Sequence, residues 1–436
     1  MDARRMGSRE AIEQLPYSLR LLSDLERFNL HDIGRFQQTT LDPSFDSRYL
    51  PQNCDAVQLP CFWIPKKYLY ICTHPAADDA DVSCLQWLSD ETRFLFPLHP
   101  ADLAHYTAFL SAVGAERVEN VSSCIWAVPT ASVRTFLAWP DAEPNRALFI
   151  KTSLHSRICG DRRISRRKAA LSVGLSALVR DCRARLPTTL SYLFEPLSLV
   201  PRSLPDSGVI FRLIPQPIKS GSVIVAPLFS LFGEATGHLP LLLRLVHETG
   251  VSLRYVLEEV LCAAFARLWL EMTLHFGLVL ESHGQDLMVE LSEDLRASGR
   301  FYYRDFEGLA VDWELRRHRK LAQPSPMPHE WAWYETYETW GYPYHQMIGQ
   351  KLRTSLNQYL RYVINPIDVK VRDWRRSGSI EEEFEPDEVT MMFSRHLFRL
   401  LREEFGFGDR AEYNIYRNLN RFVIALLKLR KNLLLK

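Results

Sequence analysis

The segment Gly277-Leu-Val-Leu-Glu-Ser-His-Gly-Gln-Asp-Leu287, followed by Phe301-Tyr-Tyr-Arg-Asp-Phe-Glu-Gly308, decides how this chain is interpreted. A long run before it, residues 251–276, carries Leu and Val at helical spacing, and Gly277 breaks the predicted helix. Two short β-rich runs within residues 287–303 predict a hairpin between the quoted segments. The hairpin would bring together two polar loops, whose candidate ligands are His283, Gln285 and Asp305.

The order of these pieces, a polar loop, a hairpin and then Asp-Phe-x-Gly, parallels the plan of protein kinases. In kinases the Asp binds Mg²⁺ on the nucleotide phosphates. The kinase His-Arg-Asp motif, its Gly-rich loop and the P-loop are absent from this chain. The pattern therefore predicts a loosely kinase-like nucleotide and metal site, with phosphotransfer as one alternative function.

Length and charge restrict the class of protein. At 436 residues the chain is too long for one compact core, so we expect two or three lobes. Lys and Arg number 53 against 52 Asp and Glu, which does not suit a protein that coats nucleic acid. No apolar run is long and uninterrupted enough to span a membrane. We expect neither nucleic-acid nor membrane partners.

The cysteines and the chain start indicate the compartment. The eight cysteines include no Cys-x-x-Cys pair, so they are predicted to be buried, reduced thiols rather than zinc ligands or a redox pair. The first ten residues are charged and no apolar signal segment follows them. The predicted location is the cytoplasm.

A second group of polar residues lies upstream, at the ends of two predicted strands. Pro129-Thr-Ala-Ser-Val-Arg-Thr135 follows one strand and Lys151-Thr-Ser-Leu154 follows the next. Hydroxyl and guanidinium groups can donate several hydrogen bonds to phosphate oxygens, and Lys supplies a point charge. Arg163 and Arg212 would complete a set of four cations suited to one polyphosphate.

These pieces together make the chain resemble a known family. In order they are Tyr49-Leu-Pro51, Phe96-Pro-Leu-His-Pro100, the segments 129–135 and 151–154, Arg163, Val209-Ile-Phe-Arg212, Glu281-Ser-His-Gly-Gln-Asp286 and Arg304-Asp-Phe-Glu-Gly308. Over roughly residues 45–400 the chain resembles the IucA/IucC family of NRPS-independent siderophore synthetases. Members use ATP to condense a carboxylic acid such as citrate with an amine or hydroxyl.

The resemblance implies specific roles and partners. His283 would face the α-phosphate of ATP as a hydrogen-bond donor, which we prefer to a general-base role, and an acyl adenylate would form there. Glu281 and Asp305 would hold Mg²⁺. The remaining nucleotide contacts would come from Ser132, Arg134, Thr135, Lys151, Arg163, Arg212 and Gln285. His283, Lys151 and Arg163 would be the catalytic set. Small-molecule acids and amines would be the substrates, the role would be iron acquisition, and a homodimer is possible.

The implied architecture is α+β with two or three lobes described as thumb, fingers and palm. Residues 1–40 would form a short helical segment, a reduced thumb. Residues 41–240 would form a fingers-like, antiparallel β-containing nucleotide lobe. Its strands are predicted in 61–64, 67–72, 124–128, 148–150 and 209–213, and its helices over 81–113 and 166–185. Residues 241–436 would form a mainly helical palm carrying the hairpin and the catalytic loop. ATP and Mg²⁺ are predicted to bind between the lobes.

Three departures from the family pattern leave a second alternative open. No His-Pro-x-x-Lys-x-Arg-x-Gly motif occurs within residues 1–48, Cys159-Gly160 replaces a usual Thr-Ser pair, and Asp286 replaces a usual Asn. The alternative is a catalytically impaired relative that acts as a binding or regulatory protein.

Four further features have plain structural interpretations. The basic cluster in 157–168 is best explained as a solvated helix face plus one ATP ligand, and the aromatic segment 329–344 as helix packing. The amphipathic segment 422–435 is predicted to dock on the core. His99 is either a buried, hydrogen-bonded side chain or a substrate contact.

Overall fold

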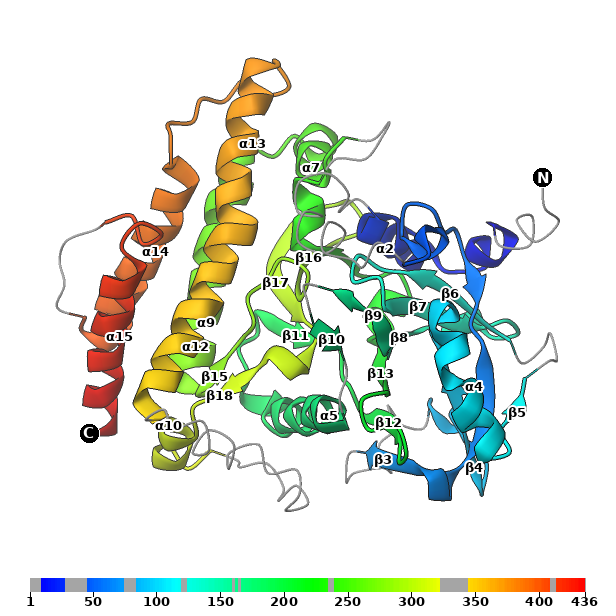
Figure 1. Ribbon diagram of the computed structural model, residues 1–436. Coiled ribbons are helices and arrows are strands. Elements are labelled where there is room, and N and C mark those ends of the chain that lie inside the picture. Colours follow the sequence, from blue (N-terminus) through cyan, green and yellow to red (C-terminus); the bar gives the residue numbers. More distant parts are fainter. Residues whose placement is uncertain are drawn as a thin grey trace. The chain divides into compact units, whose positions relative to one another are not determined.

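The computed structural model describes residues 9–27, 45–73, 84–118, 124–158, 161–163, 166–233, 239–321, 344–407 and 413–435. The chain divides into two compact units (Figure 1). Unit 1 comprises Met1–Ala177 and Leu193–Ile224, and unit 2 comprises Leu178–Tyr192 and Val225–Lys436. Both units combine sheets with helices, which confirms the predicted α+β class.

Unit 1 is organised by a seven-stranded antiparallel sheet in the order β1-β6-β7-β8-β13-β12-β3. The central strands are buried along their whole length, as expected of strands covered on both faces. The strands are β1 (Val57–Gln58), β3 (Leu69–Thr73), β6 (Ile125–Pro129), β7 (Thr135–Pro140), β8 (Leu148–Thr152), β12 (Leu197–Pro201) and β13 (Val209–Leu213). A short hairpin of β9 (Leu154–Ile158) and β10 (Asp161–Arg163) follows β8.

A smaller antiparallel sheet of unit 1, in the order β4-β2-β5, corrects one prediction. The sequence predicts helices over residues 81–113, but β4 (Arg93–Pro97) is a strand paired with β2 (Cys61–Pro65). Phe62 lies opposite Phe96, and aromatic cross-strand pairs of this kind stabilise a sheet. Helix α4 (Leu103–Ala112) begins only afterwards, and β5 (Glu116–Arg117) completes the sheet.

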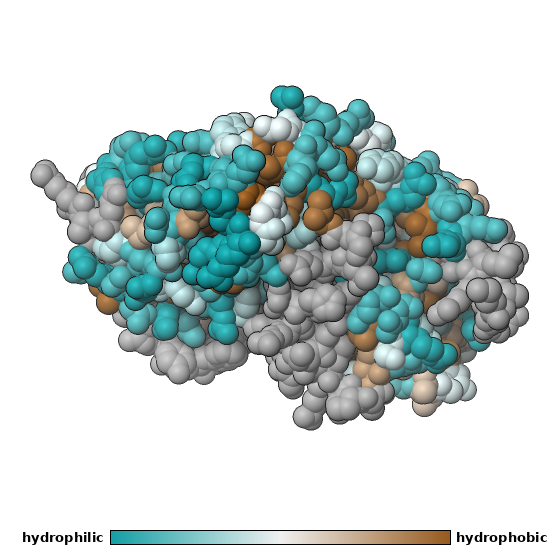
Figure 2. Space-filling view, turned by 90° about the horizontal axis from the view of Figure 1, so that it is seen from above, coloured by the Kyte–Doolittle hydropathy of each residue, from teal (hydrophilic) through white to brown (hydrophobic). Residues whose placement is uncertain are grey.

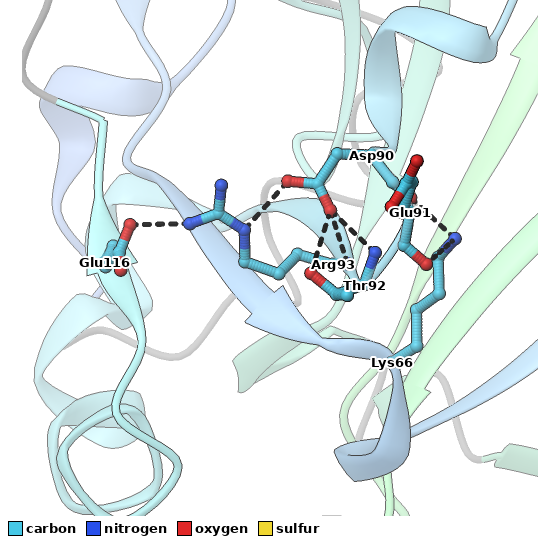
Figure 3. Close-up of polar contacts among 6 residues, drawn as sticks. All are labelled: Lys66, Asp90, Glu91, Thr92, Arg93 and Glu116. Carbon is cyan, nitrogen blue, oxygen red and sulfur yellow. Dashed lines mark hydrogen bonds and ion pairs between the residues drawn. The ribbon is translucent and has the colours of Figure 1, made fainter.

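A polar network links the two outer strands of this small sheet (Figure 3). The Arg93 guanidinium binds the Asp90 carboxylate at 2.8 Å and Glu116 at 2.6 Å, so it ties β4 to β5. Backbone and side-chain hydrogen bonds lower the pKa of Asp90 to about 2. Lys66 donates to the carbonyl oxygens of Asp90 and Glu91. These contacts satisfy local charges and need no ligand.

One long helix of unit 1 packs on the large sheet. Ala169 of α5 (Arg166–Asp181) packs in one apolar cluster with Val200 and Ile210 of the sheet. In the N-terminal segment, residues 9–13 are helical and helix α2 (Tyr17–Arg27) follows them. The Ser18 hydroxyl of α2 donates to the Ile218 carbonyl of α6 (Gln216–Lys219) at 2.6 Å.

Unit 2 contains the predicted hairpin. Strands β16 (Leu287–Leu291) and β17 (Ala297–Tyr303) pair antiparallel, as predicted. They belong to a four-stranded sheet, β11-β17-β16-β14, in which β11 (Leu190–Tyr192) runs parallel to β17 and β14 is Ile224–Pro227. A second pair joins β15 (Leu278–Val279) to β18 (Ala310–Val311). Strand β15 precedes the first polar loop and β18 follows the second, so their pairing brings the two ends of the loop–hairpin–loop segment together.

The helices of unit 2 supply the rest of its core. The predicted helical run is continuous through α8 (Leu253–Tyr255), η10 (Val256–Ala264), α9 (Phe265–Leu270) and η11 (Glu271–His275), of which η10 and η11 are π-helical. It ends at Gly277, whose φ of +61° is unfavourable for other residues. The other helices are α7 (Leu241–Thr249), α10 (Trp313–His318), α12 (Tyr344–Tyr359), α13 (Asn365–Arg376), α14 (Glu388–Phe405) and α15 (Leu419–Leu434).

Helix α15 packs on α12 and α10, which confirms the docking predicted for the C-terminal amphipathic segment. Arg430 of α15 is buried and binds both carboxylate oxygens of Asp312, at 2.5 and 2.6 Å. Figure 1 shows α12 and α13 following one another as a long rod, and the short π-helix η14 (Leu360–Ile364) joins them.

None of the seven cysteines in the described ranges forms a disulfide, as predicted, although Cys72, Cys84 and Cys124 are only partly buried. Within the same ranges, no helix is both long and apolar enough to cross a membrane. The face drawn in Figure 2 is mainly hydrophilic, with apolar side chains in small patches. Three segments lie outside the described residues: the Pro-rich residues 322–328, the aromatic segment up to residue 343, and Cys159-Gly160.

Candidate functional site

The turn between β6 and β7 carries the upstream candidates of unit 1. Thr130 N–H donates to the Thr135 carbonyl at 2.8 Å, and Arg134 N–H donates to the Ser132 carbonyl at 2.8 Å. Between them Val133 has a φ of +65°, a strained conformation for a β-branched residue. Strain of this kind persists only where the surroundings hold it, and it is common at ligand-binding sites.

Side-chain hydrogen bonds hold this turn in place. The Ser132 hydroxyl accepts from the Thr135 N–H at 3.1 Å, so it lies inside the turn. Thr152 of β8 donates to the Arg134 carbonyl from both its N–H and its hydroxyl. The turn is thus fixed to the neighbouring strand, and the Arg134 residue, only 4% exposed, is fixed with it.

Sheet register gathers three predicted residues on one face. Thr135 lies directly opposite Lys151, and Lys151 lies opposite Ile210. Opposed residues of an antiparallel pair project to the same face, as do residues two apart on one strand. Arg212, two residues beyond Ile210, therefore shares the face of Thr135 and Lys151. The Lys151 residue is 2% exposed, unusual for a lysine, so burying its charge requires a compensating interaction.

Arg212 has a partner that the sequence did not suggest. Its guanidinium binds the Glu195 carboxylate, with Nε and one terminal nitrogen 2.6 and 2.5 Å from Oε1. Ser172 of α5 also donates to Glu195. One of the four predicted cations is thus compensated within the protein, which suits a supporting role for Arg212. The backbone of Arg163 lies in β10, opposite Leu154 of β9. Leu154 follows Lys151 by three residues in the sequence.

The remaining candidates belong to unit 2, and two of them, Glu281 and Asp305, contact Tyr303. The Tyr303 hydroxyl accepts from the Glu281 N–H at 3.4 Å and donates to the Asp305 carbonyl at 3.3 Å, so it links the two polar loops. Burial raises the pKa of Tyr303 well above its ordinary value, and the nearby carboxylates of Glu281, Asp286 and Asp305 raise it further. Three carboxylates therefore lie near one buried hydroxyl.

Glu281 is held tightly from two sides. The Gln358 side-chain amide of α12 donates to Glu281 Oε1 at 2.9 Å. A Cβ atom built on Gly308 would lie 1.6 Å from Glu281 Oε2 and 2.7 Å from its Cδ. The Glu281 carboxylate thus occupies the space that a side chain at position 308 would need, which explains the glycine at the end of Asp-Phe-Glu-Gly.

His283 is oriented by its own loop and by a helix. Its Nδ1 accepts from the Gln285 N–H at 3.2 Å, which leaves Nε2 as the donor in the neutral ring. The Tyr362 ring lies 4.5 Å from the imidazole, centroid to centroid. Gln285 is itself held through its carbonyl, which accepts from Arg304 Nε at 2.9 Å. A fixed N–H donor is what the predicted role of His283 needs.

Asp305 and Glu281 are suitable oxygen ligands for Mg²⁺. Asp305 has a φ of +72°, a left-handed conformation that Asp tolerates better than most residues. Among the described residues, no three or more of His, Cys, Asp or Glu form a group arranged to hold a metal. Mg²⁺ at nucleotide sites usually binds one or two carboxylates together with phosphate oxygens. The two carboxylates on the polar loops fit that chemistry.

Several contacts of the site were not predicted from sequence. Tyr303 and Arg304 flank Asp305 within the quoted segment and could have been noticed there. Gln358 and Tyr362 gave no local signal, because they reach the loop from a helix more than seventy residues later along the chain.

The fold agrees with one class of proteins, the NRPS-independent siderophore synthetases, as the sequence resemblance predicted. The aerobactin synthetase IucA from a hypervirulent pathotype of Klebsiella pneumoniae, in its ATP-bound form, aligns with a TM-score of 0.57 at 19% identity over 95% of this chain and 76% of its own. The petrobactin biosynthesis protein AsbB from Bacillus anthracis aligns with a TM-score of 0.63 at 14% identity over 90% of this chain and 68% of its own.

Aerobactin synthetase IucC of the same Klebsiella pathotype aligns with a TM-score of 0.57 at 15% identity, covering 93% of this chain and 77% of its own. Residues 259–348 match the family described as ferric iron reductase FhuF-like transporter. Comparison with curated protein sequences gives no match. These likenesses establish the synthetase fold, and the loosely kinase-like description is not confirmed.

Proposed function

We propose that this protein condenses a polycarboxylic acid, citrate-like in chemistry, with an amine or hydroxyl in an ATP- and Mg²⁺-dependent reaction of siderophore biosynthesis. The observation that carries the proposal is the likeness to ATP-bound aerobactin synthetase over 95% of the chain. The buried Lys151 and Arg134 beside a strained hydroxyl-rich turn add to it. We place the reaction in the cytoplasm.

In the proposed reaction, a carboxylate oxygen of the acid attacks the α-phosphorus of ATP and pyrophosphate leaves. The amine or hydroxyl then attacks the acyl carbon and AMP leaves with the bonding electrons. ATP bound with Mg²⁺ supplies an α-phosphorus electrophilic enough for the first step. The protein needs no nucleophile of its own, because orienting the groups and stabilising charge are sufficient.

Each candidate has a proposed task. Ser132, Arg134 and Thr135, with Lys151 and Arg163, bind the phosphates and stabilise the negative charge that develops on pyrophosphate. Arg212 supports these phosphate-binding residues while its guanidinium is paired with Glu195. His283 donates from Nε2 to an α-phosphate oxygen, Gln285 helps bind the nucleotide, and Glu281 and Asp305 hold Mg²⁺.

Pyrophosphate release tests the proposal. The purified chain is assayed with ATP, Mg²⁺, a panel of citrate, 2-oxoglutarate and succinate, and a set of polyamines and hydroxylated diamines. We expect one acid to stimulate release, and Lys151→Ala to lower kcat by about 100-fold or more, the scale expected for a lost transition-state contact. Lys67→Ala, at an exposed lysine of the same unit, is the control. The proposal fails if no acid stimulates release, or if the two variants behave alike.

A further inference from the structure

Consecutive residues of the 281–284 loop lie against one face of the α12–η14 rod. Glu281 accepts from Gln358 at 2.9 Å, and the next residue, Ser282, exchanges a hydroxyl hydrogen bond of 3.0 Å with Ser355. The loop is thus paired with the helix residue by residue. Each of these loop residues has its own helical partner.

The contact continues through the next two loop residues. The His283 and Tyr362 rings lie 4.5 Å apart, tilted by 41°. At Gly284, a Cβ atom would lie 3.4 Å from the Tyr362 carbonyl oxygen and 3.4 Å from a Val363 methyl group. The loop therefore passes within van der Waals distance of the helix at this residue.

The helix is built to present this face. Positions 355, 358 and 362 recur at intervals of three and four, which places them on one stripe of the helix. Tyr362 lies in the π-helical turn η14, and α13 begins at Asn365-Pro366. Proline lacks an N–H to continue the ladder, and π-helical turns often occur at functional sites because they redirect side chains.

The rod is also anchored to the helical run 253–275, partly through Ser355 itself. Trp269 Nε1 donates to the Ser355 hydroxyl at 2.9 Å, and the buried Tyr359 hydroxyl donates to the Leu261 carbonyl at 2.6 Å. The Tyr359 ring stacks on Phe265 at 3.6 Å. The helical run 253–275 thus fixes the rod, and a rigid helix positions a site better than a loop does.

We propose that Gln358 and Tyr362 are positioning residues for the candidate site, Gln358 for the Glu281 carboxylate and Tyr362 for the His283 imidazole. Gln358 prevents rotation of the carboxylate away from the predicted metal position. Tyr362 fixes the plane of a ring whose Nδ1 is already held by Gln285, so that Nε2 keeps one direction. The inference rests on the proposed function and adds two residues to it.

Four variants test the inference by kinetics: Tyr362→Leu, Tyr362→Phe, Gln358→Leu and the control Arg353→Ala, which lies at an exposed position of α12. Tyr362→Leu should lower kcat for pyrophosphate release about 10- to 100-fold with little change in KM for ATP, as expected for misplacement of a reacting group. Tyr362→Phe keeps the ring and should keep the rate. Gln358→Leu should raise the Mg²⁺ concentration needed for half-maximal rate by about 10-fold or more. Equal rates in the Leu and Phe variants, whether both normal or both lost, overturn the role of Tyr362, and an unchanged Mg²⁺ requirement overturns that of Gln358.

A second measurement does not depend on turnover. NMR of ¹⁵N-labelled histidine reports which ring nitrogen carries the proton, and the His283 signals are assigned by their loss in His283→Gln. We expect a single Nε2–H form in the parent and in Tyr362→Phe, and mixed forms in Tyr362→Leu. An unchanged single form in Tyr362→Leu contradicts the inference. A parent that releases no pyrophosphate with any acid, yet shows this NMR pattern, refutes the proposed function and leaves the positioning role intact.

Discussion

At the residue scale, two tightly packed residues, Gly308 and His99, restrict which substitutions the chain can accept. Gly308 lies so close to Glu281 that an alanine methyl group there would come within 2.8 Å of the Glu281 Cβ and 2.7 Å of its Cδ, so the whole side chain would be displaced. His99 is fully buried among the rings of Phe45, Tyr49 and Phe136. Substitution at each position has a measurable consequence.

Gly308→Ala should move the Glu281 carboxylate and therefore weaken Mg²⁺-dependent activity. We expect kcat to fall about 10- to 100-fold, together with a loss of about 1–3 kcal/mol in the free energy of unfolding from overpacking. Gly378→Ala is the matched control, because its φ is +75° but open space surrounds it. It should cost about 1–2 kcal/mol of stability by backbone strain and leave activity unchanged. Normal kinetics in Gly308→Ala would contradict the assigned position of Glu281.

His99 makes a specific prediction for pH dependence. Burial lowers its pKa from 6.5 to about 4, so the native state excludes a proton that the unfolded chain accepts. Stability contributed by the neutral ring is therefore present above pH 6.5 and is lost as the pH falls toward 4. His99→Asn cannot titrate, and its side-chain oxygen can still accept from the Ala101 N–H that Nδ1 now binds.

The stability difference between the parent and His99→Asn should therefore shrink by about 2 kcal/mol between pH 7 and pH 4.5 in urea unfolding. Burial also raises the pKa of Asp102 to about 6, and this group titrates with the opposite sign over the same range. Comparing the two proteins at each pH removes its contribution. A difference that stays constant with pH would show that His99 is not buried in neutral form. Burial itself bears out one of the two interpretations left open for His99.

At the element scale, a buried carboxylate joins two helices of unit 2. Asp368 of α13 accepts from the N–H groups of Val389 and Thr390 at the start of α14, at 3.0 and 3.2 Å, and from the Thr390 hydroxyl at 2.6 Å. The first N–H groups of a helix have no partner within it, so a side chain from a neighbouring helix stabilises the start of α14. Asp368 therefore caps the start of α14 from the neighbouring helix α13.

Asp368→Ala should lower the free energy of unfolding by about 2–3 kcal/mol, because the cap is lost and buried donors remain unsatisfied. Asp373→Ala, later on the same helix, removes an exposed carboxylate paired with Arg376. That control should change stability by no more than about 0.5 kcal/mol. Urea unfolding at pH 7 measures both, and similar losses in the two variants would refute the capping role.

Elements of strong local pattern were predictable from sequence. The hairpin β16–β17, the strands that carry Lys151 and Arg212, and the helix that ends at Gly277 follow from β-rich runs, helical periodicity and a single glycine. The prediction of helix at strand β4 is wrong, because the strand is stabilised by pairing with β2, about thirty residues earlier, rather than by its own pattern.

The partners of the site residues were harder to predict. Glu195 beside Arg212, Gln358 beside Glu281 and Tyr362 beside His283 are tertiary contacts between segments distant in sequence. The side chains that the motifs supply could be named in advance, because hydroxyl, cation and carboxylate chemistry is visible residue by residue. The residues that hold those side chains in place could not be named in advance, because their positions depend on how distant segments pack together.

At the scale of the whole molecule, the candidate residues are divided between the two units: the β6–β7 turn belongs to unit 1 and the polar loops belong to unit 2. The predicted three-part division into residues 1–40, 41–240 and 241–436 stays a prediction, as do binding between the lobes and the homodimer. The central claim is the acyl adenylate, since it separates a synthetase from a phosphotransferase or a binding protein.

Transfer of oxygen from the acid to AMP tests that claim most directly. The acid that stimulates pyrophosphate release is labelled with ¹⁸O in its carboxylates, the reaction is run with ATP, Mg²⁺ and the amine, and the nucleotide product is analysed by mass spectrometry. Because the carboxylate oxygen bonds to the α-phosphorus and remains there when the amine displaces AMP, the account predicts AMP carrying one ¹⁸O atom. Unlabelled AMP, or ADP with labelled phosphate, would contradict it.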